Sequence, residues 1–253
     1  MDELIIPVFI LAALFFIVAL LYSSVGLGGA SSYVPLLALS GVYYELIPST
    51  SLVLNIAVTL IGTINFWRQG YLRIKLVGLF LLSSMPMSYL GGAIALEKEM
   101  FYLLLWLTLV FVALRIYWKK ELRLVIQLNP QYQLLVSLVI GGILGFVSGT
   151  VGIGGGIYLV PMIILFNLGS EKEAAASGAV FILLNSMAGL VARYQRDVVN
   201  FELILPLLLA VLLGGFLGSR LGAVSFKPQN IQKTLGLLVI LALVLLSQKI
   251  SFF

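Results

Sequence analysis

Apolar residues in this chain gather in long stretches separated by short polar turns. The stretches lie at about residues 4–22, 49–67, 76–96, 100–117, 132–148, 174–192, 203–223 and 234–247. Most approach the ~20 residues that an α-helix needs to cross the ~30 Å hydrocarbon layer of a bilayer. Two shorter apolar pieces lie between them, at about 33–39 and 157–168. The pattern predicts an all-α integral membrane protein.

The sequence falls into two related halves. The most polar connection, residues 118–130, lies near the middle of the chain. Residues 22–37 read YSSVGLGGASSYVPLL and residues 148–163 read SGTVGIGGGIYLVPMI, with 6 identities in 16 positions. Interrupted segments at corresponding places in two repeats are typical of a transporter's binding site. We therefore predict a first transmembrane repeat over 1–117, a cytoplasmic linker over 118–131 and a second repeat over 132–253.

Lysine and arginine predict the orientation of the chain, because cytoplasmic loops are enriched in them. The loop from Arg68 to Lys75 and the linker are basic, so both are expected in the cytoplasm. If the glycine-containing segments turn back within the membrane, 11 Lys and Arg residues lie inside and 4 lie outside. If these segments cross the membrane, 10 lie inside and 5 lie outside. This difference barely separates the two arrangements. The 17 residues from Ser31 to Ile47 span about 25 Å as helix, enough for a return. We therefore favour two inverted repeats, each with a re-entrant helical hairpin plus three transmembrane helices, and both termini outside.

Glycine runs interrupt both halves at corresponding positions. A new helix is expected to start near Ser31 and near Ile157, and the first N–H groups of a helix are unpaired and carry partial positive charge. Two such ends facing each other would bind an anion without a buried lysine or arginine. The alternative is that the glycines only permit close helix packing, the role assigned to Gly91 and Gly92. The candidate residues at the breaks are Ser24, Gly26, Gly28, Gly29, Ala30 and Ser31 in the first half, and Thr150, Gly152, Gly154, Gly155 and Gly156 in the second.

Two asparagines add to the candidate site. Asn55 in SLVLN matches Asn185 in FILLN once a gap of four residues is allowed. An amide deep in a bilayer is costly unless it is paired. Ser170 and Glu173 fit a capping box, which places Asn185 about 18 Å into its helix and near the midplane. Both amides are candidates for substrate binding, and the alternative is a structural bond between helices. The hydroxyls beside the breaks could ligate an anion oxygen or bond a helix carbonyl.

The amino-acid composition limits the kinds of functional site that the chain can form. The chain is 61% hydrophobic and 10% charged, with a formal charge of +5, and it contains no His and no Cys. All ten carboxylates lie in loops or near segment ends, so no metal site, cofactor or catalytic cluster is predicted. The positive charge suits anionic lipid, and no basic cluster of the kind that binds nucleic acid is present. Arg193, Arg196 and Arg220 are expected to be snorkelling anchors, or one of them to guard an anion entrance.

The chain resembles the sulfite exporter TauE/SafE family of bacterial membrane proteins. The resemblance rests on VGLGGASSYVP and VGIGGGIYLVP, on the stretch from Asn65 to Gly70 and on the run from Ala174 to Leu190. It implies a multi-pass protein of the bacterial inner membrane that exports sulfite or organosulfonates such as sulfoacetate. Anions of that kind fit a site made by two helix ends. Ala30 stands where the second repeat has Gly156, so the two motifs are not expected to contribute equally.

Several alternatives stay open. Transport of another small anion fits the same features, whereas transport of a cation is disfavoured because no carboxylate is expected within a span. An intramembrane enzyme would need a nucleophile, a base or a metal cluster. A membrane subunit that does not transport would not explain interrupted helices in both halves. The lipid bilayer and a small anion are the expected partners, and a homo-oligomer is compatible with the sequence.

Overall fold

The computed structural model describes residues 5–24, 28–117, 130–222 and 228–247. Ten helices and no strand occur in these ranges. The first half contains α1 Val8–Ser24, α2 Ala30–Leu39, α3 Leu46–Arg68, α4 Ile74–Ala93 and α5 Lys98–Tyr117. The second half contains α6 Pro130–Val151, α7 Gly156–Leu165, α8 Glu171–Gln195, α9 Phe201–Gly222 and α10 Pro228–Ser247. Both halves therefore have the same order, in which a short second helix follows a break. Most of the predicted linker, residues 118–129, lies outside the described residues.

Local chemistry explains where several helices begin. The predicted capping box at α8 is confirmed, since the Glu173 N–H donates to Ser170 Oγ and the Ser170 N–H donates to Glu173 Oε2. The α2 and α7 helices each contain a proline at the equivalent position, Pro35 and Pro161. Each begins directly after a glycine, and each has 10 residues, about 15 Å of helix. Neither short helix can cross the ~30 Å hydrocarbon layer alone.

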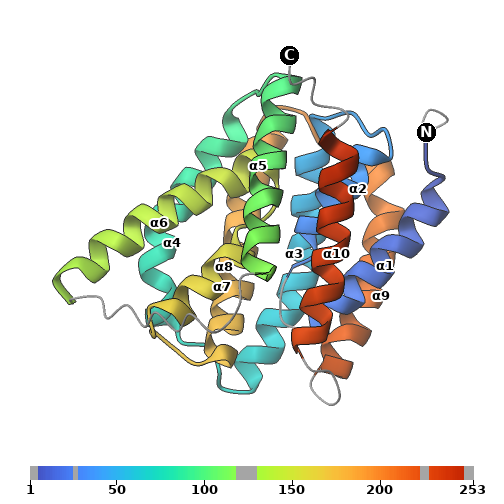
Figure 1. Ribbon diagram of the computed structural model, residues 1–253. Coiled ribbons are helices and arrows are strands. Elements are labelled where there is room, and N and C mark those ends of the chain that lie inside the picture. Colours follow the sequence, from blue (N-terminus) through green and yellow to red (C-terminus); the bar gives the residue numbers. More distant parts are fainter. Residues whose placement is uncertain (1–4, 25–27, 118–129, 223–227, 248–253) are drawn as a thin grey trace.

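The α3 and α8 helices lie in the centre and run antiparallel (Figure 1). Where α3 begins and α8 ends, Arg196 Nη2 and Glu45 Oε1 are 3.8 Å apart. In the same place Ser49 Oγ donates to the Val198 carbonyl. At the opposite end, Arg73 Nη1 and Glu173 Oε1 are 3.2 Å apart. We call these the Arg196 end and the Arg73 end of the molecule.

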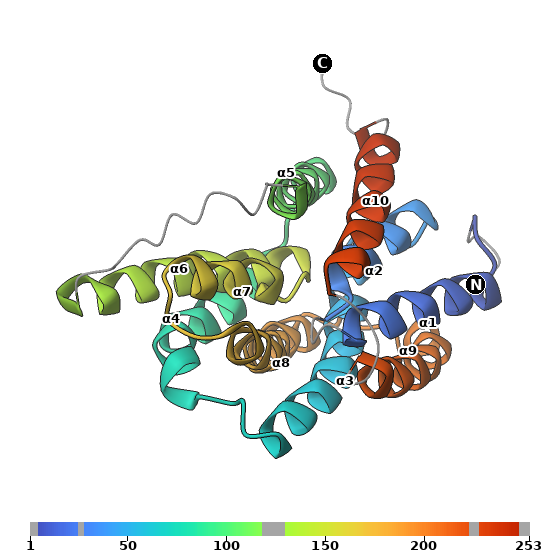
Figure 2. The ribbon, with the colours of Figure 1, turned by 60° about the horizontal axis from the view of Figure 1, so that its bottom comes forward.

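Pairs of helices from different halves flank this centre. The α4 helix packs against α6 on one side, and α1 packs against α9 on the other (Figure 2). Each pair joins the first helix of one half to the fourth helix of the other half. The two halves therefore interlock around α3 and α8 and do not form separate bundles.

Glycines allow the α4 and α6 backbones to approach closely. Gly141, Gly145 and Gly149 recur every four residues on one face of α6. A Cβ at any of them would overlap a carbonyl oxygen of α4, namely that of Phe80, Ser84 or Ser88. Small residues at this spacing are the usual way in which membrane helices pack closely.

The same contact recurs between α1 and α9. A Cβ at Gly214 or Gly218 of α9 would overlap a carbonyl oxygen of α1. The packing role predicted for Gly91 and Gly92 is also confirmed, because a Cβ at either would overlap a backbone carbonyl of α6 or α8. Both flanking pairs therefore depend on glycine for their spacing.

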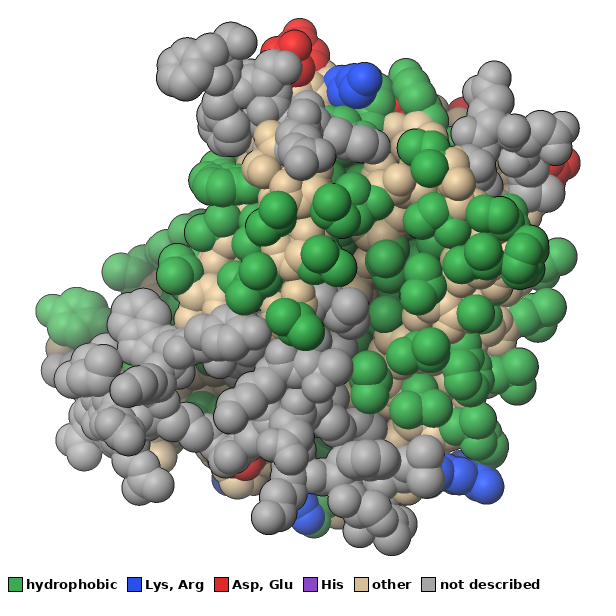
Figure 3. Space-filling view, turned by 45° about the vertical axis from the view of Figure 1, so that its right-hand side comes forward, with side chains coloured by type: hydrophobic (Ala, Val, Ile, Leu, Met, Phe, Trp, Pro, Cys, Tyr) green, Lys and Arg blue, Asp and Glu red, His purple; other side chains and the backbone are tan. Residues whose placement is uncertain are grey.

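The outer surface is suited to lipid. Five of the described helices are long and apolar enough to cross a membrane, namely α3, α4, α6, α8 and α9. Apolar side chains cover the flank in Figure 3, whereas charged side chains lie toward the upper and lower ends. Large exposed apolar residues include Leu82, Leu114, Leu135, Ile143, Leu205 and Leu213. A soluble protein rarely exposes so continuous an apolar surface.

The glycine contact between α4 and α6 predicts a stability difference. We expect Gly145→Ala to lower the stability of the purified protein by about 1–3 kcal/mol, because its Cβ must displace the α4 backbone. Gly142→Ala is the matched control, since its Cβ would lie 3.7 Å from the nearest atom, Met87 Cγ. The stability difference is checked by thermal melting of both purified variants in detergent, with the size-exclusion profile as the measure of folded protein. Equal melting temperatures would contradict the assigned contact.

Candidate functional site

The two breaks begin their short helices in the same way. Before α2, the Gly29 carbonyl accepts the N–H groups of Ser32 and Tyr33, each at 2.9 Å. Before α7, the Gly155 carbonyl accepts those of Tyr158 and Leu159, at 3.1 and 3.3 Å. All these positions correspond in the aligned repeats. The N–H groups before these have no partner one turn back in their own helix, and in the second break that of Gly156 donates to the Gly154 carbonyl at 3.0 Å.

The backbones of the two breaks nevertheless differ. Gly152, Gly154 and Gly155 have φ of +84°, +82° and +74°, which only glycine adopts readily. Gly29, the residue that caps α2, has φ of −84°. Gly26 lies outside the described residues. The second break therefore has a strict need for glycine at Gly152, Gly154 and Gly155, whereas an unequal contribution of the two motifs to a site stays a prediction.

Both breaks meet at Asn55 of α3. A Cβ on Gly28 would lie 2.8 Å from Asn55 Oδ1, and a Cβ on Gly154 would lie 2.8 Å from Asn55 Nδ2. The Ile182 side chain of α8 also borders both glycines, at 3.3 and 2.7 Å by the same measure. The structure thus brings together three of the predicted residues, Gly28, Gly154 and Asn55, from widely separated parts of the chain.

The amide of Asn55 has no hydrogen-bond partner among the described residues. Its side chain is fully buried, and neither Nδ2 nor Oδ1 is bonded. Asn185 is equally buried but differs, since its Nδ2 donates to the Phe181 carbonyl at 2.8 Å and only its Oδ1 is unbonded. An amide left unpaired in a buried site costs about 1–3 kcal/mol. Asn55 is therefore the predicted residue whose hydrogen-bonding capacity is least used.

Some hydroxyl groups near the breaks are bonded within the protein, whereas those of Ser23 and Ser148 have no hydrogen-bond partner among the described residues. Ser31 Oγ lies 2.5 Å from the Tyr22 hydroxyl, and Ser32 Oγ lies 3.0 Å from it. Thr150 Oγ1 donates to the Phe146 carbonyl at 3.0 Å, one turn back in its own helix. The alternative interpretation, a bond to a helix carbonyl, is therefore the one that Thr150 follows. The Ser24 side chain lies outside the described part of the chain.

The remaining candidates serve the packing of the short helices. Gly152 lies against Pro48 of α3, and its carbonyl accepts a hydrogen bond of 2.9 Å from Ser51 Oγ. A Cβ at Gly156 would overlap Ile182, and one at Gly155 would lie 2.9 Å from Phe181 Cε1. Ala30 is fully buried. The glycine contacts fix the second break and α7 against α3 and α8.

Arg193 is not the snorkelling anchor that the sequence suggested. It is only 4% exposed. Its Nη2 donates to the carbonyls of Gly149 and Thr150 at 3.0 and 2.7 Å, and its Nε donates to Gly149 at 3.3 Å. Those carbonyls belong to the last turn of α6, whose dipole favours a cation. No sequence pattern indicates this contact, because a basic residue in the last turn of α8 also fits an ordinary helix end.

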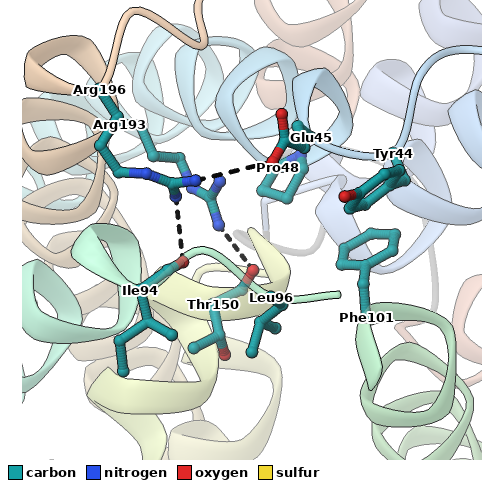
Figure 4. A pocket seen from close by; sticks show the side chains of 9 residues that line it. All are labelled: Tyr44, Glu45, Pro48, Ile94, Leu96, Phe101, Thr150, Arg193 and Arg196. Atoms are coloured by element: carbon teal, nitrogen blue, oxygen red, sulfur yellow. Dashed lines mark hydrogen bonds and ion pairs between the residues drawn. The ribbon is translucent and has the colours of Figure 1, made fainter. Parts of the chain in front are cut away.

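A small pocket lies at the Arg196 end, directly beyond the second break (Figure 4). Its volume of about 10 Å³ holds about one water molecule. The residues that line it are Tyr44, Glu45, Pro48, Ile94, Leu96, Phe101, Thr150, Arg193 and Arg196. Figure 4 shows both guanidinium groups reaching from α8 toward the space between α3 and α6.

Apolar spanning helices, with broken helices from both halves around a shared buried amide, define a multi-pass membrane transporter. Comparison with known proteins agrees with this class. The chain belongs to the sulfite exporter TauE/SafE family, whose profile matches residues 11–246.

Curated relatives carry names of the same class. The chain is 38% identical over 219 residues to the "Probable membrane transporter protein y4hK" of Sinorhizobium fredii, covering 84% of this chain and 87% of the relative. It is 28% identical to "Probable membrane transporter protein YjnA" of Bacillus subtilis over 82% of this chain and 87% of that protein. A third relative, "Probable membrane transporter protein YunE" of Bacillus subtilis, is 27% identical over 96% and 97% of the two chains. No solved structure matches the chain.

The unpaired amide predicts an unusual effect on stability. We expect Asn55→Leu to keep or raise the free energy of unfolding of the ligand-free protein, by up to about 1–3 kcal/mol, because it removes an unsatisfied buried group. Asn185→Leu should gain less, since it also loses the bond to Phe181. Thermal melting of both variants in detergent tests this. A clear drop for Asn55→Leu would mean that the amide has a structural partner.

Proposed function

We propose that this protein carries small oxyanions, sulfite or an organosulfonate such as sulfoacetate, across the bacterial inner membrane. The observation that carries the proposal is the buried amide of Asn55 between the two glycine breaks, which has no hydrogen-bond partner in the described part of the chain. Its Nδ2 can donate two hydrogen bonds to an anion. The family description names sulfite export, whereas the names of the relatives give no substrate.

The electrostatics of the breaks favour an anion. The helices α2 and α7 begin beside Gly28 and Gly154, which both border Asn55. A helix N-terminus carries about half a positive charge and offers free N–H donors. Two such ends with an amide donor between them provide positive potential in a low-dielectric setting. No Asp or Glu is among the buried polar residues described, so nothing in that set would attract a cation to this place.

The proposed site is closed in this conformation. The side chains of Asn55 and Ile182 occupy the space between the breaks, at 2.7 to 3.3 Å from the positions where glycine Cβ atoms would stand. An anion would have to displace Ile182 and take up the bonds of the Asn55 amide. In this mechanism the remaining glycines of the two breaks, together with Asn185, complete the site by keeping the short helices next to α3 and α8.

We also propose that the halves form an inverted repeat with re-entrant hairpins. Support comes from the antiparallel arrangement of α3 and α8, which are equivalent helices of the two repeats. The short lengths of α2 and α7 suit a return to the side of entry. The basic residues then place the Arg73 end in the cytoplasm and the Arg196 end outside. Each break would thus enter the membrane from a different side.

Binding by Asn55 can be measured directly. We expect Asn55→Leu to weaken sulfite or sulfoacetate binding to the purified protein by about 1–3 kcal/mol, or about 5- to 150-fold. Thr59→Val is the matched control one turn further along α3, because the Thr59 hydroxyl already donates to the Asn55 carbonyl at 2.7 Å. The control should bind within about threefold of the parent protein. If a folded Asn55→Leu variant binds both anions like the parent, the amide is not part of the site.

Single cysteines test the orientation, since the chain has no Cys of its own. In intact cells, a membrane-impermeant maleimide should label Glu97→Cys and Val199→Cys. Gln69→Cys should react only after the cells are permeabilised, because it lies in the loop between α3 and α4. The inverted arrangement would be wrong if Val199→Cys behaved like Gln69→Cys, as four parallel crossings in each half require.

A further inference from the structure

Arg193 carries a buried charge and forms no ion pair with a carboxylate among the described residues. Its three hydrogen bonds go to the neutral carbonyls of Gly149 and Thr150. The ion pairs of the described residues are Arg73 with Glu173 and Arg196 with Glu45, and neither includes Arg193. Taking a charge out of water is expensive unless an opposite charge compensates it. The α6 dipole supplies about half a negative charge, so part of the Arg193 charge stays uncompensated.

The pocket beside Arg193 has an excess of positive charge. Arg196 and Glu45 line the same pocket and pair with each other. Arg196 also donates to the carbonyls of Gly92 and Ile94 at 3.2 and 3.0 Å. Two guanidinium groups and one carboxylate leave a net charge of one positive unit at this cavity. A single small oxyanion would neutralise it.

The pocket connects to the breaks along one face of α3. Pro48 lines the pocket and also packs against Gly152. One turn further, Ser51 donates to the Gly152 carbonyl, and one turn beyond that lies Asn55. The distance from Pro48 to Asn55 is seven residues, about 10 Å of helix. The Arg193 pocket therefore lies next to the proposed central site, on the side of the Arg196 end.

We propose that the Arg193 pocket is a second anion site, which holds a small oxyanion on its way to or from Asn55. This inference rests on the proposed function, since it assigns the mouth of the same route. The Arg196–Glu45 pair lines the pocket and joins the end of α8 to the start of α3, and the space beside it is too small for sulfite. When the pair separates, Arg196 adds a second cation beside Arg193 and the pocket can admit the anion.

Binding stoichiometry and two sets of variants test this proposal. Sulfite binding is measured by calorimetry on the detergent-purified full chain at constant ionic strength set with sodium chloride. The parent should bind two sulfite ions, and Asn55→Leu should keep one. Adding Glu45→Gln to Asn55→Leu should tighten the remaining site at least threefold, because the carboxylate no longer competes for Arg196. Adding Arg193→Gln to Asn55→Leu should abolish sulfite binding at the remaining site.

Two controls separate a binding role from a structural one. Arg73→Gln breaks the ion pair at the opposite end and should leave the remaining site unchanged within twofold. Arg193→Lys keeps the charge and should keep weakened binding even if loss of the guanidinium lowers the melting temperature. If Arg193→Gln folds and the remaining sulfite binds as before, Arg193 only caps α6 and the proposal is overturned.

The outcomes also distinguish this inference from the proposed function. A parent that binds one sulfite ion, with none left in Asn55→Leu or in Asn55→Leu with Glu45→Gln, would refute the Arg193 pocket and leave the central site intact. Binding that depends on Arg193 but is unaffected by Asn55→Leu would support the pocket and refute the central site.

Discussion

An interrupted helix inside a membrane leaves backbone groups that lipid cannot bond, and the structure depends on how these groups are buried. The breaks before α2 and α7 both lie against Asn55 of α3 and Ile182 of α8. Ser51 donates to the Gly152 carbonyl, and Gly28 and Gly154 meet at Asn55. This requirement accounts for the central position of α3 and α8. It also accounts for the outer position of the glycine-packed pairs, α4 with α6 and α1 with α9.

The duplication explains why two breaks can share one centre. A single half would bury its short helix on one side only, and its third helix would face lipid with Asn55 or Asn185 exposed. Antiparallel packing of α3 against α8 covers both faces at once and brings the breaks together from opposite ends. The equivalent bonds of Gly29 and Gly155 show that both short helices begin with the same hydrogen-bond pattern. Their different φ angles show that the halves have diverged at the backbone.

The sequence predicted those parts of the candidate site that a short run of neighbouring residues identifies. Short runs of neighbouring residues predict the helix spans, the capping box of α8, both glycine breaks and the two asparagines. Ile182 and Arg193 have no such signature. Ile182 is one apolar residue within an apolar helix, and its place between the breaks depends on the crossing of α3 and α8. Arg193 bonds carbonyls 43 and 44 residues earlier in the chain, a contact that only tertiary packing defines.

The closed state of the site bears on how it would open. The cavity beside Arg193 has room for about one water molecule, and Asn55 and Ile182 fill the space between the breaks. Each end of the α3 and α8 pair carries one ion pair between partly exposed side chains, at 3.8 Å for Arg196 with Glu45 and 3.2 Å for Arg73 with Glu173, and the Ser49 hydroxyl also donates to the Val198 carbonyl at the Arg196 end. Exposed pairs contribute about 0–1 kcal/mol, far less than the glycine-packed contacts of α4 with α6. Separation at one end is therefore cheaper than separation of the flanking pairs. Relative motion of α3 and α8 about Asn55, with the flanks intact, is the movement that the energetics favour.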